Sequence, residues 1–179
     1  MGLGLLGRLK NLLGHHGLDR KGFPIYAPIS GEVIPLDDVP DVIFSERIVG
    51  DGIAIKPTSD RVVAPVNGCV VQIFETNHCI IIRAPNNAEI MIHLGIDTED
   101  LAGMGFKRLI SVNQNVSVGD PLLELDLPYL ETNAKSTITP VVISNVSEVH
   151  LSHLDHYEGK VSAGSSIVMN AFFDEVRKQ

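Results

Sequence analysis

The sequence predicts an all-β fold, an antiparallel β-sandwich or flattened barrel of duplicated half-units with short helices. Its 179 residues include 16 Gly and 10 Pro but only 5% aromatic residues and no Trp, a balance that favours short strands joined by turns. The apolar segments are short, and two sequence patterns occur twice. A hydrophobic content of 44% is sufficient for the core of one ordinary domain.

Residues 1–22 differ from the rest of the chain and are expected to form a flexible amphipathic leader before one domain, residues 23–179. Their net charge of +3 leaves −11 on the domain, for a total of −8. Leucines at helical spacing beside basic residues are typical of a helix that lies on a membrane surface. We therefore expect residues 1–20 to contact an anionic membrane transiently; an unstructured, solubilising leader is the alternative.

The composition also predicts a cytoplasmic location. The apolar part of the leader is too short and too interrupted to span a bilayer, and it lacks the cleavage site of a secretory signal. Cys69 and Cys79 match no zinc or redox spacing and are expected to be reduced core thiols. The net charge of −8 argues against a nucleic-acid partner, because this surface would repel phosphates.

The repeated patterns indicate an internal duplication. Ala-Pro-Ile-Ser-Gly-Glu-Val at residues 27–33 recurs as Ala-Pro-Val-Asn-Gly-Cys-Val at residues 64–70, and in both a Pro and a Gly turn the chain into a strand. A second pattern, Val-Gly-Asp followed by an apolar strand, occurs at residues 49–55 and again at residues 118–125. In both places Gly-Asp is expected to make the turn. We infer two half-barrels from one ancestral unit.

Further elements follow from apolar runs and from alternation with a period of two. Short helices are predicted at residues 100–102 and 127–134. Strands are predicted at residues 70–74, 80–83, 90–94, 139–143 and 166–171.

Two of the seven histidines interrupt apolar, strand-like segments. In residues 90–94, alternation places Ile90, Ile92 and Leu94 on the core face and Met91 and His93 on the other. An imidazole in an apolar strand is costly to bury unless it has a hydrogen-bond partner, so it indicates either such a partner or a functional role.

The second of these histidines, His78, shares a face with Thr76, which can hydrogen-bond to its ring. If the strands of His78 and His93 are neighbours, the two imidazoles form a pair, and one is neutral and nucleophilic near neutral pH. Two satisfied, buried histidines are the alternative, because the spacing alone does not establish that the strands are adjacent.

Five longer segments add a resemblance to a known family. They are Val-Pro-Asp-Val-Ile-Phe (39–44), Ile-Val-Gly-Asp-Gly-Ile-Ala-Ile-Lys-Pro (48–57), Phe-Glu-Thr-Asn-His (74–78), His-Leu-Gly-Ile-Asp-Thr (93–98) and Lys-Ser-Thr-Ile-Thr-Pro-Val-Val-Ile-Ser-Asn (135–145). Together they resemble the glucose-type enzyme IIA of the bacterial phosphoenolpyruvate:sugar phosphotransferase system, from about residue 23 to 170. The resemblance implies an antiparallel sandwich of the duplicated hybrid motif type.

The resemblance implies a phosphocarrier, a component of a phosphotransferase, that needs no cofactor for the transfer. His93 would accept a phosphoryl group from the histidine phosphocarrier protein HPr and pass it to the IIB domain of a glucose-type permease. His78 would donate a hydrogen bond to the phosphoryl oxygens, and Thr76 would fix the tautomer of His78.

The resemblance also implies a surface for partners. Asp41 and Asp97 would face the cationic donor protein, which the negative domain would attract. The unphosphorylated form would regulate sugar permeases, glycerol kinase and adenylate cyclase, and thereby catabolite repression. The apolar docking residues would be Val42, Ile43, Phe44, Ile48, Val49 and Met91.

A metal is implied only at an interface, where His78 and His93 would bind Zn²⁺ together with a carboxylate of the partner. Two histidines alone are expected to bind zinc weakly. The chain departs from the family pattern beside His93, where Met91 and Leu94 replace phenylalanines. This departure is expected to change partner preference more than the transfer chemistry.

Two other functions fit parts of the sequence. A biotinyl or lipoyl-like carrier shares the turn patterns, but no exposed hairpin lysine of that type is present. A zinc-binding sandwich domain without phosphotransfer would need a third fixed ligand, and Met91 interrupts the His-x-His pattern. The three histidines His150, His153 and His156 are expected to form a solvated segment rather than a metal site.

Overall fold

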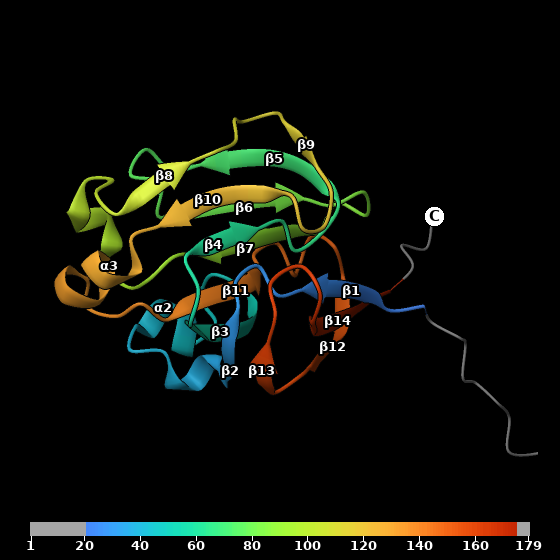
Figure 1. Cartoon of the computed structure of the whole chain (residues 1–179). Helices are drawn as coiled ribbons and strands as arrows, with labels where there is room; N and C mark the ends of the chain where they lie inside the picture. Colours follow the sequence, from blue (N-terminus) through green and yellow to red (C-terminus); the bar gives the residue numbers. More distant parts are fainter. Residues whose placement is uncertain (1–20, 175–179) are drawn as a thin grey trace, which may run out of the picture.

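The computed structural model describes residues 21–174, which form fourteen strands, two short α-helices and two 3-10 helices (Figure 1). Every strand pairing is antiparallel, so the all-β prediction is confirmed. The membrane contact predicted for residues 1–20 lies outside the described residues. Between residues 21 and 174, no helix has the length and hydropathy needed to cross a bilayer.

The largest sheet has eight strands in the order β13-β2-β3-β11-β7-β6-β5-β9. Their bounds are β13 Gly159–Val161, β2 Gly31–Pro35, β3 Asp51–Pro57, β11 Thr139–Ile143, β7 Glu89–His93, β6 Cys79–Arg83, β5 Gly68–Ile73 and β9 Asn115–Val116.

Two sheets of three strands complete the sandwich, in the orders β1-β14-β12 and β4-β10-β8. Figure 1 shows the first at the right of the molecule and the second in its upper half. The strand bounds are β1 Phe23–Tyr26, β14 Ile167–Phe173, β12 Leu151–His156, β4 Arg61–Val63, β10 Pro121–Leu125 and β8 Phe106–Arg108.

The helices are short, as predicted, and two of them were expected in these places. Helix α3 covers Leu127–Asn133, and Asp126 caps it by accepting a hydrogen bond from the Tyr129 amide. The helix predicted at residues 100–102 is a 3-10 turn, η2, at Thr98–Leu101. The remaining two, η1 at Leu36–Asp38 and α2 at Val42–Ser45, lie between β2 and β3.

The first repeat corresponds to a two-fold arrangement of the backbone. The Tyr26 amide donates to the Pro65 carbonyl at 2.9 Å, and the Val63 amide donates to the Pro28 carbonyl at 2.8 Å. Tyr26 and Val63 both precede the Ala-Pro of their repeat. The two hydrogen bonds are therefore equivalent, and each half-unit contacts the other through the same turn.

The second repeat was matched to the wrong segment. The Gly119 amide donates to Ala64 at 2.9 Å, and the equivalent bond to Ala27, at 2.8 Å, comes from Gly164. The counterpart of residues 118–125 is therefore the turn that leads into β14. Residues 49–55 belong mostly to β3, which by strand order corresponds to β6. A Gly turn before an apolar strand is a local pattern, so it cannot distinguish between these partners.

One large core is shared by the three sheets, and a smaller one lies on the other face of the eight-stranded sheet. In β7 the side chains of Ile90 and Ile92 are fully buried in the large core. Met91 packs against the smaller core, which is covered by the η1–α2 segment. The two faces predicted for β7 are confirmed, and His93 lies on the face of the smaller core.

Candidate functional site

The predicted pair of histidines exists because β6 and β7 are antiparallel neighbours. His78 immediately precedes β6, and His93 is the last residue of β7, so the start of one strand lies beside the end of the other. The Leu94 amide donates to the His78 carbonyl at 2.7 Å, which extends the pairing past the strands. The ring centroids are 5.0 Å apart, with the planes at 72°.

The ring of His93 is oriented by the backbone that follows it. Its Nδ1 lies 2.8 Å from the Gly95 carbonyl oxygen. A carbonyl only accepts, so Nδ1 carries the proton and Nε2 keeps its lone pair. Gly95 has φ +80°, and a Cβ there would lie 2.5 Å from Thr98 Cγ2. The turn that presents this carbonyl therefore requires glycine at position 95.

The ring of His78 is held by the neighbour that the sequence indicated. Its Nδ1 is hydrogen-bonded to Thr76 Oγ1, while the side chain is only 7% exposed. A threonine hydroxyl can donate or accept, so Thr76 is compatible with either tautomer of His78. When the hydroxyl donates to Nδ1, Nε2 carries a proton and faces the shared site as a donor.

Both imidazoles favour the neutral form. Burial is the main cause that lowers the pKa of His93; the Gly95 carbonyl and the acidic residues Glu99, Asp41 and Asp97 oppose it. Burial also lowers the pKa of His78, with a further decrease from His93 and an opposing effect of Glu99. When Thr76 donates to Nδ1 of His78, the two neutral rings provide one free nucleophilic nitrogen and one hydrogen-bond donor, which suits transfer of an anionic group.

Phe44 is part of the site's support rather than of a docking surface, so that prediction was wrong. Its side chain is 1% exposed and its ring centroid lies 5.0 Å from that of His93. The reason is the single turn of α2, which begins where Asp41 accepts a hydrogen bond from the Ile43 amide at 2.9 Å. That turn directs Phe44 inward and its neighbours outward.

Three of the remaining apolar residues are exposed around this turn. Val42 is 63%, Ile43 38% and Ile48 66% exposed, whereas Val49 and Met91 are half-buried and pack against the smaller core. We call Val42, Ile43 and Ile48 the apolar rim. An exposed apolar rim beside a polar pair is typical of a protein-binding surface.

The acidic residues predicted beside the site have structural partners. Asp41 caps α2, as described, and Asp97 pairs with Lys135, with the carboxylate oxygen 3.5 Å from the ammonium nitrogen. Asp97 has φ +56°, a left-handed conformation that starts η2 and reverses the chain. Both carboxylates are close enough to favour the protonated form of His93.

Sequence reasoning missed Glu99. The reversal at Asp97 brings its carboxylate back toward the rings, and the ligand-type atoms of His78, His93 and Glu99 all lie within 4.8 Å of one another. The residue stands six positions after His93, and on an extended strand that spacing would separate the two residues by about 20 Å. The only indications in the sequence were the turn-forming residues Gly95 and Asp97.

The three other histidines of the described chain, His150, His153 and His156, do not face one another. His153 and His156 both lie on β12, three positions apart and therefore on opposite faces. His153 pairs instead with the exposed Asp155 carboxylate, at 2.9 Å. His150 precedes the strand with φ +52°.

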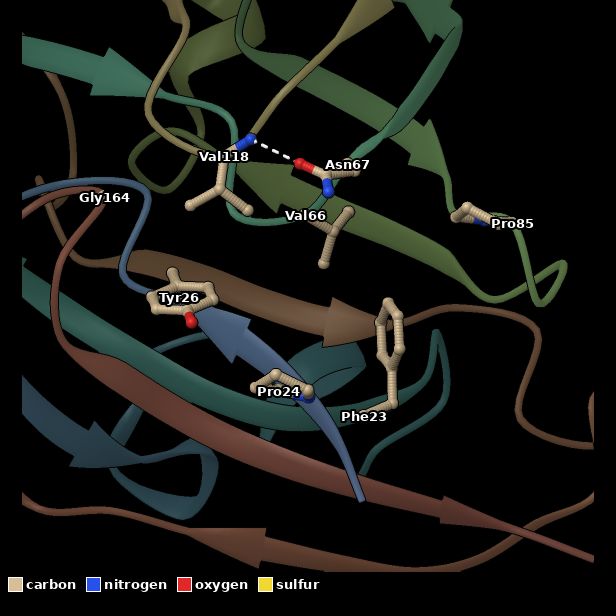
Figure 2. Close-up of a pocket in the computed structure, with 8 residues that line it drawn as sticks. All are labelled: Phe23, Pro24, Tyr26, Val66, Asn67, Pro85, Val118 and Gly164. Atoms are coloured by element: carbon tan, nitrogen blue, oxygen red, sulfur yellow. Dashed lines mark hydrogen bonds between the residues drawn. The ribbon is translucent and has the colours of Figure 1, made fainter. Parts of the chain in front are cut away.

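A separate hollow lies near β1, away from the two histidines (Figure 2). Figure 2 shows Val118 and Asn67 on one side of it, joined by a hydrogen bond of 2.8 Å from the Val118 amide, and Tyr26 on the other. No carboxylate, imidazole or thiol is among the residues that line it. These residues are Phe23, Pro24, Tyr26, Val66, Asn67, Pro85, Val118 and Gly164.

Cys79 lies opposite His93 in the strand pairing, but its chemistry is suppressed. Burial raises the pKa of its thiol to about 12, so its thiolate fraction near pH 8 is about a thousandfold below that of a thiol with the ordinary value. We expect iodoacetamide to modify only the partly exposed Cys69 in the folded protein. Peptide mapping by mass spectrometry should show both cysteines modified after unfolding; rapid native modification of Cys79 would contradict this.

A family model, a curated protein and a solved structure that resemble this chain all point to one family. The family model described as phosphoenolpyruvate-dependent sugar phosphotransferase system, EIIA 1, matches residues 23–149. The glucose-specific EIIA component of the PTS system of Haemophilus influenzae is 48% identical over 145 residues, 81% of this chain and 86% of that protein. The solved structure of the glucose permease IIA from Mycoplasma capricolum matches with a TM-score of 0.79 and 34% identity, over 86% of this chain and 97% of that one.

A fourth match is to part of a larger protein. The N-acetylglucosamine-specific EIICBA component of the PTS system of Klebsiella pneumoniae is 49% identical over 142 residues. These residues are 79% of this chain but only 22% of that protein.

Proposed function

This chain belongs to the EIIA 1 family of the phosphoenolpyruvate-dependent sugar phosphotransferase system, and from that membership we propose that His93 carries the phosphoryl group. Membership itself makes the chain a phosphocarrier in sugar transport. The observation that supports His93 as the carrier is the hydrogen bond between its Nδ1 and the Gly95 carbonyl. It leaves Nε2 of a half-buried, neutral ring as the free nucleophile.

Acceptance is an in-line displacement at phosphorus. The Nε2 lone pair forms the new N–P bond while the N–P bond of the donor, the phosphohistidine of HPr, breaks and returns its electron pair to the donor ring. Positive charge develops on His93 as the bond forms. The Gly95 carbonyl accepts the hydrogen bond from Nδ1–H, so it stabilises that charge without a proton transfer.

His78 is the proposed stabiliser of the phosphoryl group. Its ring lies beside that of His93, and the Thr76 hydroxyl bonded to Nδ1 leaves Nε2–H free to donate to a phosphoryl oxygen. A donor fixed in advance in a largely buried position stabilises charge in the transition state more than solvent does. In this proposal His93 is the nucleophile and His78 is the hydrogen-bond donor.

The acceptor of the group is proposed to be a cysteine of a IIB domain. The larger relative from Klebsiella pneumoniae is named an EIICBA component and contains a segment 49% identical to this chain, which supports a functional link between the A and B domains. A thiolate attacks the phosphorus, the N–P bond breaks, and the electron pair returns to Nε2 of His93.

The apolar rim defined above is the proposed docking surface for these partners. It lies on and just after α2, whose Phe44 ring contacts His93, and Asp41 and Asp97 act on the same ring. The negative domain attracts a cationic donor. Phosphorylation adds about two negative charges beside the rim. The unphosphorylated form is therefore the one proposed to bind sugar permeases, glycerol kinase and adenylate cyclase, which would couple regulation to sugar supply.

His78→Gln is expected to retain acceptance and slow onward transfer. Nε2 of His93 remains free in this variant, since its orientation depends on Gly95. The departing phosphoryl group loses one fixed donor, a loss that typically costs about 10²-fold or more in rate. Rapid-quench measurement of transfer to a IIB domain, with Thr76→Ser as a matched control that keeps the hydroxyl, should show this. Undiminished transfer would remove His78 from the mechanism.

Reconstitution tests the proposed function as a whole. The full chain is incubated with phosphoenolpyruvate, enzyme I and HPr, then with a glucose-type IIB domain, and intact masses are measured under alkaline conditions that preserve phosphohistidine. One phosphoryl group should appear on this chain only when HPr is present, and the IIB domain should then remove it. Absence of HPr-dependent labelling would exclude the phosphocarrier role.

A further inference from the structure

One exposed carboxylate lies beside the two imidazoles. One nitrogen of each ring, in His78 and His93, and a carboxylate oxygen of Glu99 all lie within 4.8 Å of one another. No residue between 21 and 174 forms a hydrogen bond or ion pair with the Glu99 side chain. Its negative charge is therefore uncompensated within the described chain, and it stands next to the proposed position of the phosphoryl group.

The other two carboxylates of the site differ from Glu99 in this respect. Asp41 accepts a hydrogen bond from a backbone amide of α2, and Asp97 pairs with a lysine. Against the dominant effect of burial, all three carboxylates raise the pKa of His93, but only Glu99 also raises the pKa of His78. Glu99 is thus the one of the three that acts on both rings.

The backbone holds Glu99 in this place. Gly95 and Asp97 have positive φ, which reverses the chain after β7. The Thr98 hydroxyl donates to the Leu94 carbonyl at 2.7 Å, and Thr98 is fully buried. Because the residue before Glu99 is fixed in this way, the charge stays beside the rings even when the exposed side chain changes its rotamer.

We propose that Glu99 raises the phosphoryl-transfer potential of this chain, which makes it a weaker acceptor from HPr and a stronger donor to the IIB domain. The inference rests on the proposed function, because it concerns the phosphoryl group on His93. Once that group is bound to Nε2, its negatively charged oxygens share the site with the Glu99 carboxylate. Like charges at this range, which is shorter than the Debye length, repel each other and destabilise the phosphorylated form.

The repulsion acts on the equilibrium of the first transfer. In that reaction the N–P bond in HPr breaks, the N–P bond to His93 forms, and the electron pair returns to the donor ring. Only the phosphorylated form of this chain places the group beside Glu99. Coulomb's law for two unit charges about 5 Å apart at an exposed site predicts an effect of about three- to tenfold on the equilibrium constant.

The equilibrium constant measures this effect directly. Radioactively phosphorylated HPr is mixed with the full chain in the absence of phosphoenolpyruvate and enzyme I, and the label on each protein is measured after an alkaline quench. Glu99→Gln preserves the size of the side chain and removes its charge. The constant should therefore shift toward the phosphorylated chain by about three- to tenfold.

Asp100→Asn is the matched control. It removes an exposed charge from the same turn, η2, but Asp100 is not among the groups that shift the pKa of either histidine. Its equilibrium constant should stay close to that of the wild type.

Two further measurements separate an effect of charge from a structural role of the side chain. Glu99→Asp keeps the charge on a shorter side chain, so its constant should stay closer to that of the wild type than to that of Glu99→Gln. The difference between the wild type and Glu99→Gln should also shrink as the salt concentration rises, because ions screen an exposed charge. A purely structural effect would not depend on salt in this way.

The inference is supported if the constant shifts only when the charge at position 99 is lost and if salt reduces the shift. It is overturned if Glu99→Gln has the constant of the wild type, if Asp100→Asn or Glu99→Asp shifts the constant as much, or if salt has no effect. It is also overturned if Glu99→Gln changes only the KM for phosphorylated HPr, as a docking contact would. A wild type that HPr does not label contradicts the proposed function, and the inference falls with it.

Discussion

His93→Gln is expected to abolish phosphoryl acceptance. Glutamine keeps a polar side chain of similar length over Phe44, whose ring contacts His93, so the variant should remain folded. It has no nucleophilic nitrogen, because the amide lone pair is delocalised. Incubation with phosphoenolpyruvate, enzyme I and HPr, followed by intact mass under alkaline conditions, should show no added phosphoryl group.

His78→Gln is the internal control for this result, since it removes the other ring of the pair and is expected to be labelled. Circular dichroism on both variants separates a chemical loss from a folding defect. Full labelling of a folded His93→Gln variant would show that another residue accepts the group, and His78 would be the first alternative.

Phe44→Ala is expected to destabilise the fold by about 3–5 kcal/mol, the usual cost of removing a fully buried aromatic side chain. Phe44 is buried in the smaller core with Leu36 and Val39 from the same segment. Its loss would leave a cavity beneath His93. Urea unfolding followed by circular dichroism measures the change in the free energy of unfolding.

Ile48→Ala is the matched control from the apolar rim. Ile48 is 66% exposed, so its substitution is expected to change the free energy of unfolding by no more than about 0.5 kcal/mol. It should instead raise the KM for phosphorylated HPr. A Phe44→Ala variant as stable as Ile48→Ala would mean that Phe44 lies on the docking surface after all.

The sequence predicted which side chains of β7 face the core, but it did not predict that β6 is the strand beside it. Alternation with a period of two depends only on local backbone geometry, and it placed His93 opposite Ile90 and Ile92 correctly. The pairing of His78 with His93 depends on β6 and β7 being adjacent. No local pattern determines strand neighbours, so the resemblance to a known family was needed to choose between the two interpretations.

The errors have a common physical cause, which is chain reversal. Phe44 was expected on the docking surface together with Val42 and Ile43 because the resemblance implied it, but consecutive residues of a helical turn point about 100° apart, and here only Phe44 points into the core. Glu99 was missed because its position depends on the positive φ of Gly95 and Asp97. The second repeat was matched to residues 49–55 because a Gly turn looks the same before any apolar strand.

The nitrogen that carries phosphorus is the most direct test of the central claim. The chain, with its histidines labelled with ¹⁵N, is phosphorylated through HPr, and the nitrogen bonded to phosphorus is identified by ¹⁵N and ³¹P NMR. Because the Gly95 carbonyl accepts a hydrogen bond from Nδ1–H of His93, phosphorus should be bonded to Nε2 of His93, with Nδ1 still protonated. Phosphorus bonded to Nδ1 of His93, or to either nitrogen of His78, would contradict it.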